Sequence, residues 1–138
     1  MPPEVGLVIP YWFLWGRESE AGEESGRKAR PCVVVIAVRR GADEIAVAVA
    51  PITHAPPAAG QRAVELDAAV KRQLKLDHAR SWVICDELNE FTWPGFDLGR
   101  TPDGRSAFGR LPFKLTDRIR AEAADAIRAG AMKKTKRD

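Results

Sequence analysis

The sequence predicts a mostly β protein of the α+β class, with five to seven short strands and one C-terminal helix. Three segments carry this prediction. Cys32 to Val38 is an unbroken apolar run, mainly β-branched, which is typical of a buried strand. Glu44 to Pro51 alternates strictly between aliphatic residues and alanines, and a turn-forming segment joins the two runs as a hairpin. Pro112 to Ala129 changes to a helical period. This order fits a small barrel or a half-open roll.

The remaining elements are shorter. Asp67 to Leu74 predicts one or two helical turns with Asp67 as the N-cap, and Gly130 stands where the C-cap of the last helix belongs. Gly16 to Ala29 is polar and predicts a long loop. The last helix should bury one stripe, formed by Leu115, Ile119, Ala123, Ala126 and Ile127. Further strands are expected within Val5–Trp15, Ala63–Leu66, Ser81–Leu88 and Ser106–Leu111.

The positive charge is concentrated at the C-terminus. The chain has 138 residues and a net charge of +3, and its last nine residues hold four cations against Asp138, which already makes +3. The rest of the chain is therefore neutral, unlike the body of a general nucleic-acid binder. We expect one domain over residues 1–130 and a basic, disordered tail over 131–138, which more often serves solubility than binding.

The sequence also indicates the compartment. The first apolar run, Gly6 to Trp15, is too short for a bilayer span, and the first residues lack a basic signal region. Cys32 and Cys85 lie in apolar runs without zinc-ligand spacing. We therefore expect a cytoplasmic protein with two buried free thiols and no metal site.

Several short motifs together resemble one family. Arg30-Pro31 leads directly into valines, a later strand ends in Ala50-Pro51-Ile52-Thr53, and Gly109-Arg110-Leu111 precedes the last helix. Ala63-Val64-Glu65-Leu66 and Leu74-Lys75-Leu76-Asp77 fit the segments between them. In this order the motifs resemble the MazF/PemK toxins over about residues 5 to 128. The resemblance implies an SH3-like barrel with a C-terminal helix, and a homodimeric, metal-independent endoribonuclease that needs no cofactor and is neutralised by a small acidic antitoxin.

The resemblance also implies site residues. Arg30 matches the catalytic arginine of the family and Thr53 the catalytic threonine, while Glu24, or alternatively Glu23, matches a loop glutamate. An arginine that the family often carries after a later strand is replaced here by Asn89.

Metal-independent RNA cleavage requires a proton acceptor for the 2′-hydroxyl, positive charge at the phosphate and a proton for the leaving 5′-oxygen. Arg30 suits the charge role and Thr53 can donate a hydrogen bond, but neither transfers protons easily. His54 follows Thr53, and histidine titrates near neutral pH, so we consider it as a general acid or base. The alternative is that His54 only hydrogen-bonds locally.

Other residues are candidates for substrate binding. Arg27 and Lys28 could contact RNA together with Glu24, or could pair with the neighbouring acidic run. Trp93, beside Pro94-Gly95, could offer an exposed platform for stacking with a base.

Two other functions stay open. The same barrel serves CcdB-like proteins, which bind a protein partner without cutting nucleic acid and end in Trp-Gly-Ile, whereas this chain ends in Lys136-Arg137-Asp138. A degenerate relative could keep the fold and dimerise without cleaving.

Overall fold

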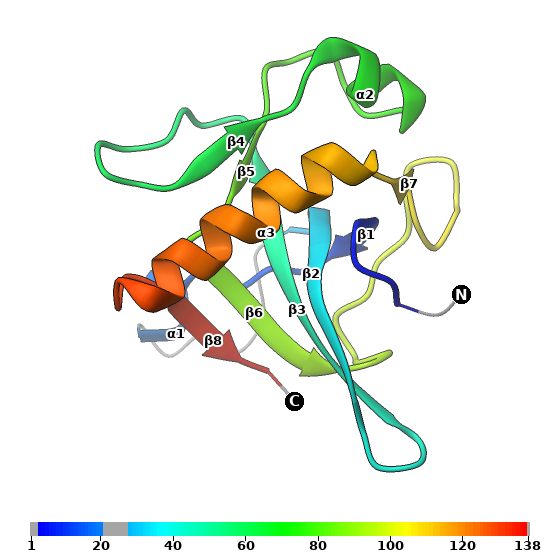
Figure 1. Cartoon of the computed structure of the whole chain (residues 1–138). Helices are drawn as coiled ribbons and strands as arrows, with labels where there is room; N and C mark the ends of the chain where they lie inside the picture. The colour runs from blue at the N-terminus through cyan, green and yellow to red at the C-terminus, as the bar shows by residue number, and fades with distance from the viewer. Residues whose placement is uncertain (1–2, 21–27, 138) are drawn as a thin grey trace.

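The computed structural model describes residues 3–20 and 28–137. These residues form a mostly β α+β fold of eight strands and three helices, with the long helix α3 lying across the sheet (Figure 1). The strands are β1 (Leu7–Tyr11), β2 (Arg30–Arg40), β3 (Glu44–Thr53), β4 (Ala63–Glu65), β5 (Trp82–Ile84), β6 (Glu87–Thr92), β7 (Gly109–Arg110) and β8 (Lys133–Lys136). The helices are α1 (Gly16–Glu20), α2 (Ala68–Gln73) and α3 (Phe113–Arg128).

β3 is the central strand. It pairs with β2 along one side, and on the other side its first half pairs with β6 and its end with β5. The main path runs β4-β5-β3-β2-β1-β7, and β8 adds to β6 in parallel. Among the described residues, the sheet does not close into a barrel, and it has eight strands where five to seven were expected.

The C-terminal prediction was wrong. Residues 133–136 form strand β8 instead of part of a disordered tail, and Lys133 to Lys136 pair with Glu87 to Glu90 of β6. Thr135 and Arg137 are buried. The sequence suggested a solvated tail because four cations stand together, but alternation along a strand turns only some of them to solvent.

The segment Ser81–Leu88, predicted as one strand, is divided into β5 and β6. The division falls at Cys85 and Asp86, where the Asp86 carboxylate accepts a hydrogen bond from the Arg62 amide at 3.0 Å and the Asp86 carbonyl accepts one from Lys133. Before this point the chain pairs with β4, and after it with β8. A change of partner strand within one apolar run leaves no periodicity signal.

The helices follow the predicted pattern more closely. Asp67 caps α2 by accepting a hydrogen bond from the Val70 amide at 2.9 Å, as expected. In the predicted loop 16–29, residues 16–20 form α1. α3 buries Thr116, Ile119, Ala123 and Ala126. Ile127, predicted in the buried stripe, is 54% exposed.

The sheet has an apolar cluster on each face. One cluster contains Val33, Ala48 and Ala50 with residues of α2 and α3. The other contains Cys32, Val34, Val47 and Val49 together with the aromatic residues Tyr11, Phe13, Trp15, Trp82 and Phe91. We call this second side the aromatic face, because the candidate site lies at its edge.

Candidate functional site

The hairpin register brings Arg30 and Thr53 together. Cys32 of β2 stands opposite Pro51 of β3, so Arg30 and Thr53, two residues further along each strand, lie at the same end of this pair. Side chains alternate along a strand, so both share the face of Cys32, which is the aromatic face. The sequence prediction that places these two residues in one site is consistent with this geometry.

Arg30 is half-buried against an aromatic ring. Its guanidinium lies 5.3 Å from the centre of the Trp15 ring, and that of Arg17 lies 5.0 Å from the same ring. Burial lowers the pKa of the Arg30 guanidinium, and the charge of Glu18 opposes this shift. The Nε atom of Arg30 is buried and has no hydrogen-bond partner in the described part of the chain. Arg30 is thus a cation held in place against the Trp15 ring.

Thr53 lies between the main sheet and the β4–β5 pair. Its backbone stands opposite Trp82, and its hydroxyl accepts a hydrogen bond from the Ala55 amide at 3.2 Å. The guanidinium of Arg80 lies 4.9 Å from the centre of the Trp82 ring and is bound by Glu65 through two hydrogen bonds of 2.8 Å. A second arginine–tryptophan pair therefore flanks Thr53.

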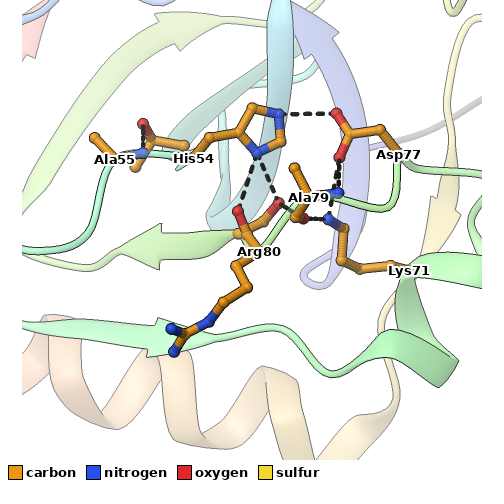
Figure 2. Close-up of polar contacts among 8 residues, drawn as sticks. His54, Ala55, Lys71, Asp77, Ala79 and Arg80 are labelled. Carbon is orange, nitrogen blue, oxygen red and sulfur yellow. Dashed lines mark hydrogen bonds and ion pairs between the residues drawn. The ribbon is translucent and has the colours of Figure 1, made fainter.

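His54 is held by protein groups at both ring nitrogens (Figure 2). Nε2 lies 2.8 Å from the Asp77 carboxylate, and Nδ1 lies 3.1 Å from the Arg80 carbonyl and 3.2 Å from the Ser81 hydroxyl. The Asp77 carboxylate and the Arg80 carbonyl are both hydrogen-bond acceptors. In this arrangement His54 links the segment after Thr53 to residues 77–81, and both ring nitrogens contact protein groups.

Lys71 and Asp77 complete this network. The ammonium group of Lys71 is buried, lies 3.1 Å from the Asp77 carboxylate and donates to the Ala79 carbonyl. Burial acts to raise the pKa of Asp77, but the hydrogen bond from Lys71 and the charge of His54 outweigh it, so the pKa lies below its usual value. The Asp77 carboxylate therefore bridges the Lys71 ammonium group and the His54 ring.

Of the four predicted substrate-binding residues, the structure describes only Lys28 and Trp93. Glu24 and Arg27 lie outside the described residues, as does Glu23. Lys28 is exposed, two residues before Arg30. Trp93 is half-buried and stacks on Phe91 with ring centres 6.3 Å apart, so one face of its ring is occupied.

Asn89 occupies a buried position where an arginine reaches it from another strand. Its side chain exchanges two 2.8 Å hydrogen bonds with the backbone of Leu14. Arg137 donates to the Asn89 Oδ1 atom at 2.8 Å and to the Trp12 carbonyl at 3.1 Å, and pairs with Asp97 at 2.9 Å. Arg137, directly after β8, thus supplies a guanidinium beside Asn89.

Sequence reasoning missed several of these residues. Arg17 and Arg80 were given no role, and Arg137 was assigned to a tail. The Trp15 ring contacts Arg17, two residues later, and also Arg30. The Trp82 ring contacts Arg80, two residues earlier. No short sequence motif marks such pairs. Among the described residues, no group of three His, Cys, Asp or Glu side chains could hold a metal ion, and no helix is long and apolar enough to cross a bilayer.

Another cleft lies away from these residues. It has a volume of about 710 Å³ and runs between the N-terminal segment and the start of α3, with Glu4 and Arg110 paired at 2.8 Å on its wall. None of the predicted site residues lines it.

Comparisons with known proteins returned no match: no family model fits the chain, and neither a curated protein nor a solved structure matches it.

Proposed function

We propose that this protein is a metal-independent endoribonuclease toxin that cleaves single-stranded RNA, with Arg30 and Thr53 at its catalytic centre and a small acidic antitoxin as its inhibitor. The proposal includes an SH3-like arrangement of the strands, a homodimer and a cytoplasmic location. The observation that supports it best is the shared end and face of Arg30 and Thr53, which follows from the β2–β3 register. Residues far apart in the sequence are thereby presented to one ligand.

Arg30 has the properties of a phosphate clamp. A guanidinium can bind two phosphate oxygens at once, and stacking on Trp15 fixes its plane. Its Nε atom is buried, so the terminal NH groups are the donors that would meet an oxyanion. Because the side chain is already half-buried, its interaction with a developing negative charge is weakened less by solvent. Glu18 balances the charge of Arg30 and so positions it.

The reaction forms a bond from the 2′-oxygen to phosphorus while the bond to the 5′-oxygen breaks. The 2′-hydroxyl gives its proton to an acceptor, and the leaving 5′-oxygen takes up a proton from water. Arg30 stabilises the charge on the non-bridging oxygens, and Thr53 donates one hydrogen bond to them. His54 acts here as a positioning residue for Thr53, since both its nitrogens are engaged. The acceptor is then a carboxylate of the loop before Arg30, for which Glu24 is the candidate.

Cleavage of single-stranded RNA in EDTA tests the proposal. We expect wild-type protein to cut, Arg30→Ala to lower the rate about 100-fold or more, and Thr53→Val to lower it about tenfold. Arg40→Ala, at the exposed hairpin end, is the matched control and should cut normally. Circular dichroism confirms that each variant folds. Equal rates for Arg30→Ala and wild type would overturn the proposal.

A non-catalytic module that binds a protein partner is the second candidate. The observation in its favour is His54, whose two ring nitrogens both contact protein groups. No cleavage of any RNA by folded wild-type protein would support this function instead.

A further inference from the structure

A small pocket lies beside the candidate site, on the same side of the sheet. Its volume is about 270 Å³, and it is lined by Leu7, Ile9, Trp93, Leu98, Arg100 and Ser106, among others. Pockets for drug-sized ligands run from about 300 to 1,000 Å³, so this one suits a smaller ligand. Leu7 and Ile9 belong to the cluster on the aromatic face, where Arg30 also lies.

The distance between the pocket and Arg30 follows from the strand pairing. Tyr11 pairs with Arg30 on one side and forms a bridge to Leu98 on the other. Adjacent strands lie about 4.8 Å apart, so Leu98 and Arg30 are separated by about 10 Å. Gly99 donates a hydrogen bond to the Pro10 carbonyl at 2.8 Å, and a Cβ added to it would lie 3.3 Å from Ala29. The wall of the pocket therefore touches the residue that precedes Arg30.

A column of stacked aromatic rings runs from Tyr11, the strand neighbour of Arg30, to the pocket. Tyr11 stacks on Phe91 with ring centres 4.6 Å apart, and Phe91 stacks on Trp93 at 6.3 Å. Trp93 ends this column at the pocket. A planar ligand that entered the pocket would extend the stack by one ring.

The pocket also offers polar groups for recognition. Arg100 is exposed and makes no ion pair or hydrogen bond with the described residues, and the Ser106 hydroxyl is exposed beside it. The loop between them is braced, because the Thr101 hydroxyl accepts a hydrogen bond from the Arg105 amide at 2.8 Å and Arg105 donates to the Phe108 carbonyl at 3.2 Å. A braced loop presents its side chains with little ordering cost on binding.

We propose that this pocket binds one nucleobase of the RNA, adjacent to the phosphate held by Arg30. The base stacks on Trp93, and Arg100 reads its edge. An arginine most often reads guanine, through two hydrogen bonds to O6 and N7, so the pocket favours guanine over cytosine. The inference rests on the proposed function and assigns the sequence preference of the same site to Trp93 and Arg100.

Nucleotide titration tests the inference without cleavage. Guanosine 5′-monophosphate is added to full-length wild-type protein while the indole NH signals of the tryptophans are followed by NMR, with Trp93 assigned from Trp93→Phe. We expect a saturable shift of the Trp93 signal, and a weaker response to cytidine 5′-monophosphate. Arg100→Ala removes an exposed side chain that makes no hydrogen bond or ion pair within the described part of the chain, and it should weaken guanosine monophosphate binding about tenfold or more. Arg40→Ala should bind as wild type does.

The two proposals fail separately. Guanosine monophosphate should still bind Arg30→Ala, because the pocket holds the base whereas Arg30 contacts only the phosphate. In cleavage, Arg100→Ala should change the preferred sequence or raise KM while leaving kcat near the wild-type value. The pocket proposal would be overturned by an unchanged Trp93 signal at saturating nucleotide, or by Arg100→Ala binding the nucleotide as tightly as wild type. Either result would stand even if the protein cleaves RNA. Nucleotide binding without any RNA cleavage would support the nucleobase pocket and contradict the proposed nuclease function.

Discussion

Replacing Arg137 with alanine should destabilise the whole protein, although this residue is next to the C-terminus. Its guanidinium is bound to Asn89, to the Trp12 carbonyl and to Asp97, and it lies 5.6 Å from the centre of the Tyr11 ring. It thus joins β8, β6, the segment after β1 and the loop after β6. The Arg137 and Asp97 side chains are 3% and 15% exposed, so their ion pair is largely withdrawn from water.

The magnitude follows from these contacts. Removing one partner of a buried ion pair costs about 3 to 5 kcal/mol, and the lost hydrogen bonds are included in that range because such effects do not add. At about 2.1 cal/mol/K of unfolding entropy per residue, a chain of 138 residues loses roughly 3.5 °C of Tm per kcal/mol. The expected fall in Tm is therefore roughly 10 to 17 °C.

Thermal and urea unfolding followed by circular dichroism measure this effect. Lys136→Ala, one residue earlier and exposed, is the control and should change the free energy of unfolding by at most about 0.5 kcal/mol. A double-mutant cycle with Asp97→Ala should show a coupling of more than about 1 kcal/mol. If Arg137→Ala lies within about 1 kcal/mol of wild type, the C-terminal strand does not hold the fold in the way described.

Three further predictions concern stability and reactivity. Gly6 has a φ of +93°, and a Cβ added to it would lie 2.9 Å from the Thr116 side chain. Gly104 has a similar φ of +84° but open space around it, so Gly6→Ala should lower the free energy of unfolding by more than Gly104→Ala does. Equal losses of stability in urea unfolding would contradict this. Asp77 has a lowered pKa, so its contribution to stability is present above the unfolded pKa of 3.8 and is lost as pH falls through the lower folded value. The free energy of unfolding of Asp77→Asn should therefore fall less steeply than that of wild type below about pH 4. An identical pH dependence of the two proteins in this range would refute the prediction. Burial raises the pKa of Cys85 to about 12 and that of Cys32 as well, so iodoacetamide at pH 8 should label neither thiol until the protein unfolds; rapid labelling of the native state would show that they are accessible.

The parts of the fold that local pattern controls could be predicted from the sequence. The β2–β3 hairpin follows from the alternation of valines and alanines, and the same alternation places Arg30 and Thr53 on one face. α2 begins at its predicted cap, Asp67. In each case the physical cause acts over a few neighbouring residues, so it leaves a trace in the sequence.

Contacts between distant segments could not be predicted in this way. β8 forms because Thr135 and Arg137 find buried partners on β6 and in the loop at Asp97, which lies 40 residues earlier in the chain. The contacts of His54 come from Asp77, Arg80 and Ser81, which only the pairing of β3 with β5 brings near. Local composition is the same whether or not such pairs form, so the sequence predicts a disordered tail and leaves open whether His54 acts as an acid or base or only hydrogen-bonds locally.

Analysis of the RNA product ends tests the central claim most directly. If Arg30 clamps the phosphate while the 2′-hydroxyl attacks it, each cut in EDTA leaves a 2′,3′-cyclic phosphate on one product and a 5′-hydroxyl on the other. The same ends should vanish with Arg30→Ala and on a substrate whose scissile nucleotide lacks the 2′-hydroxyl. Products with a 5′-phosphate and a 3′-hydroxyl, or cleavage of the 2′-deoxy substrate, would contradict the proposed role of Arg30 and Thr53.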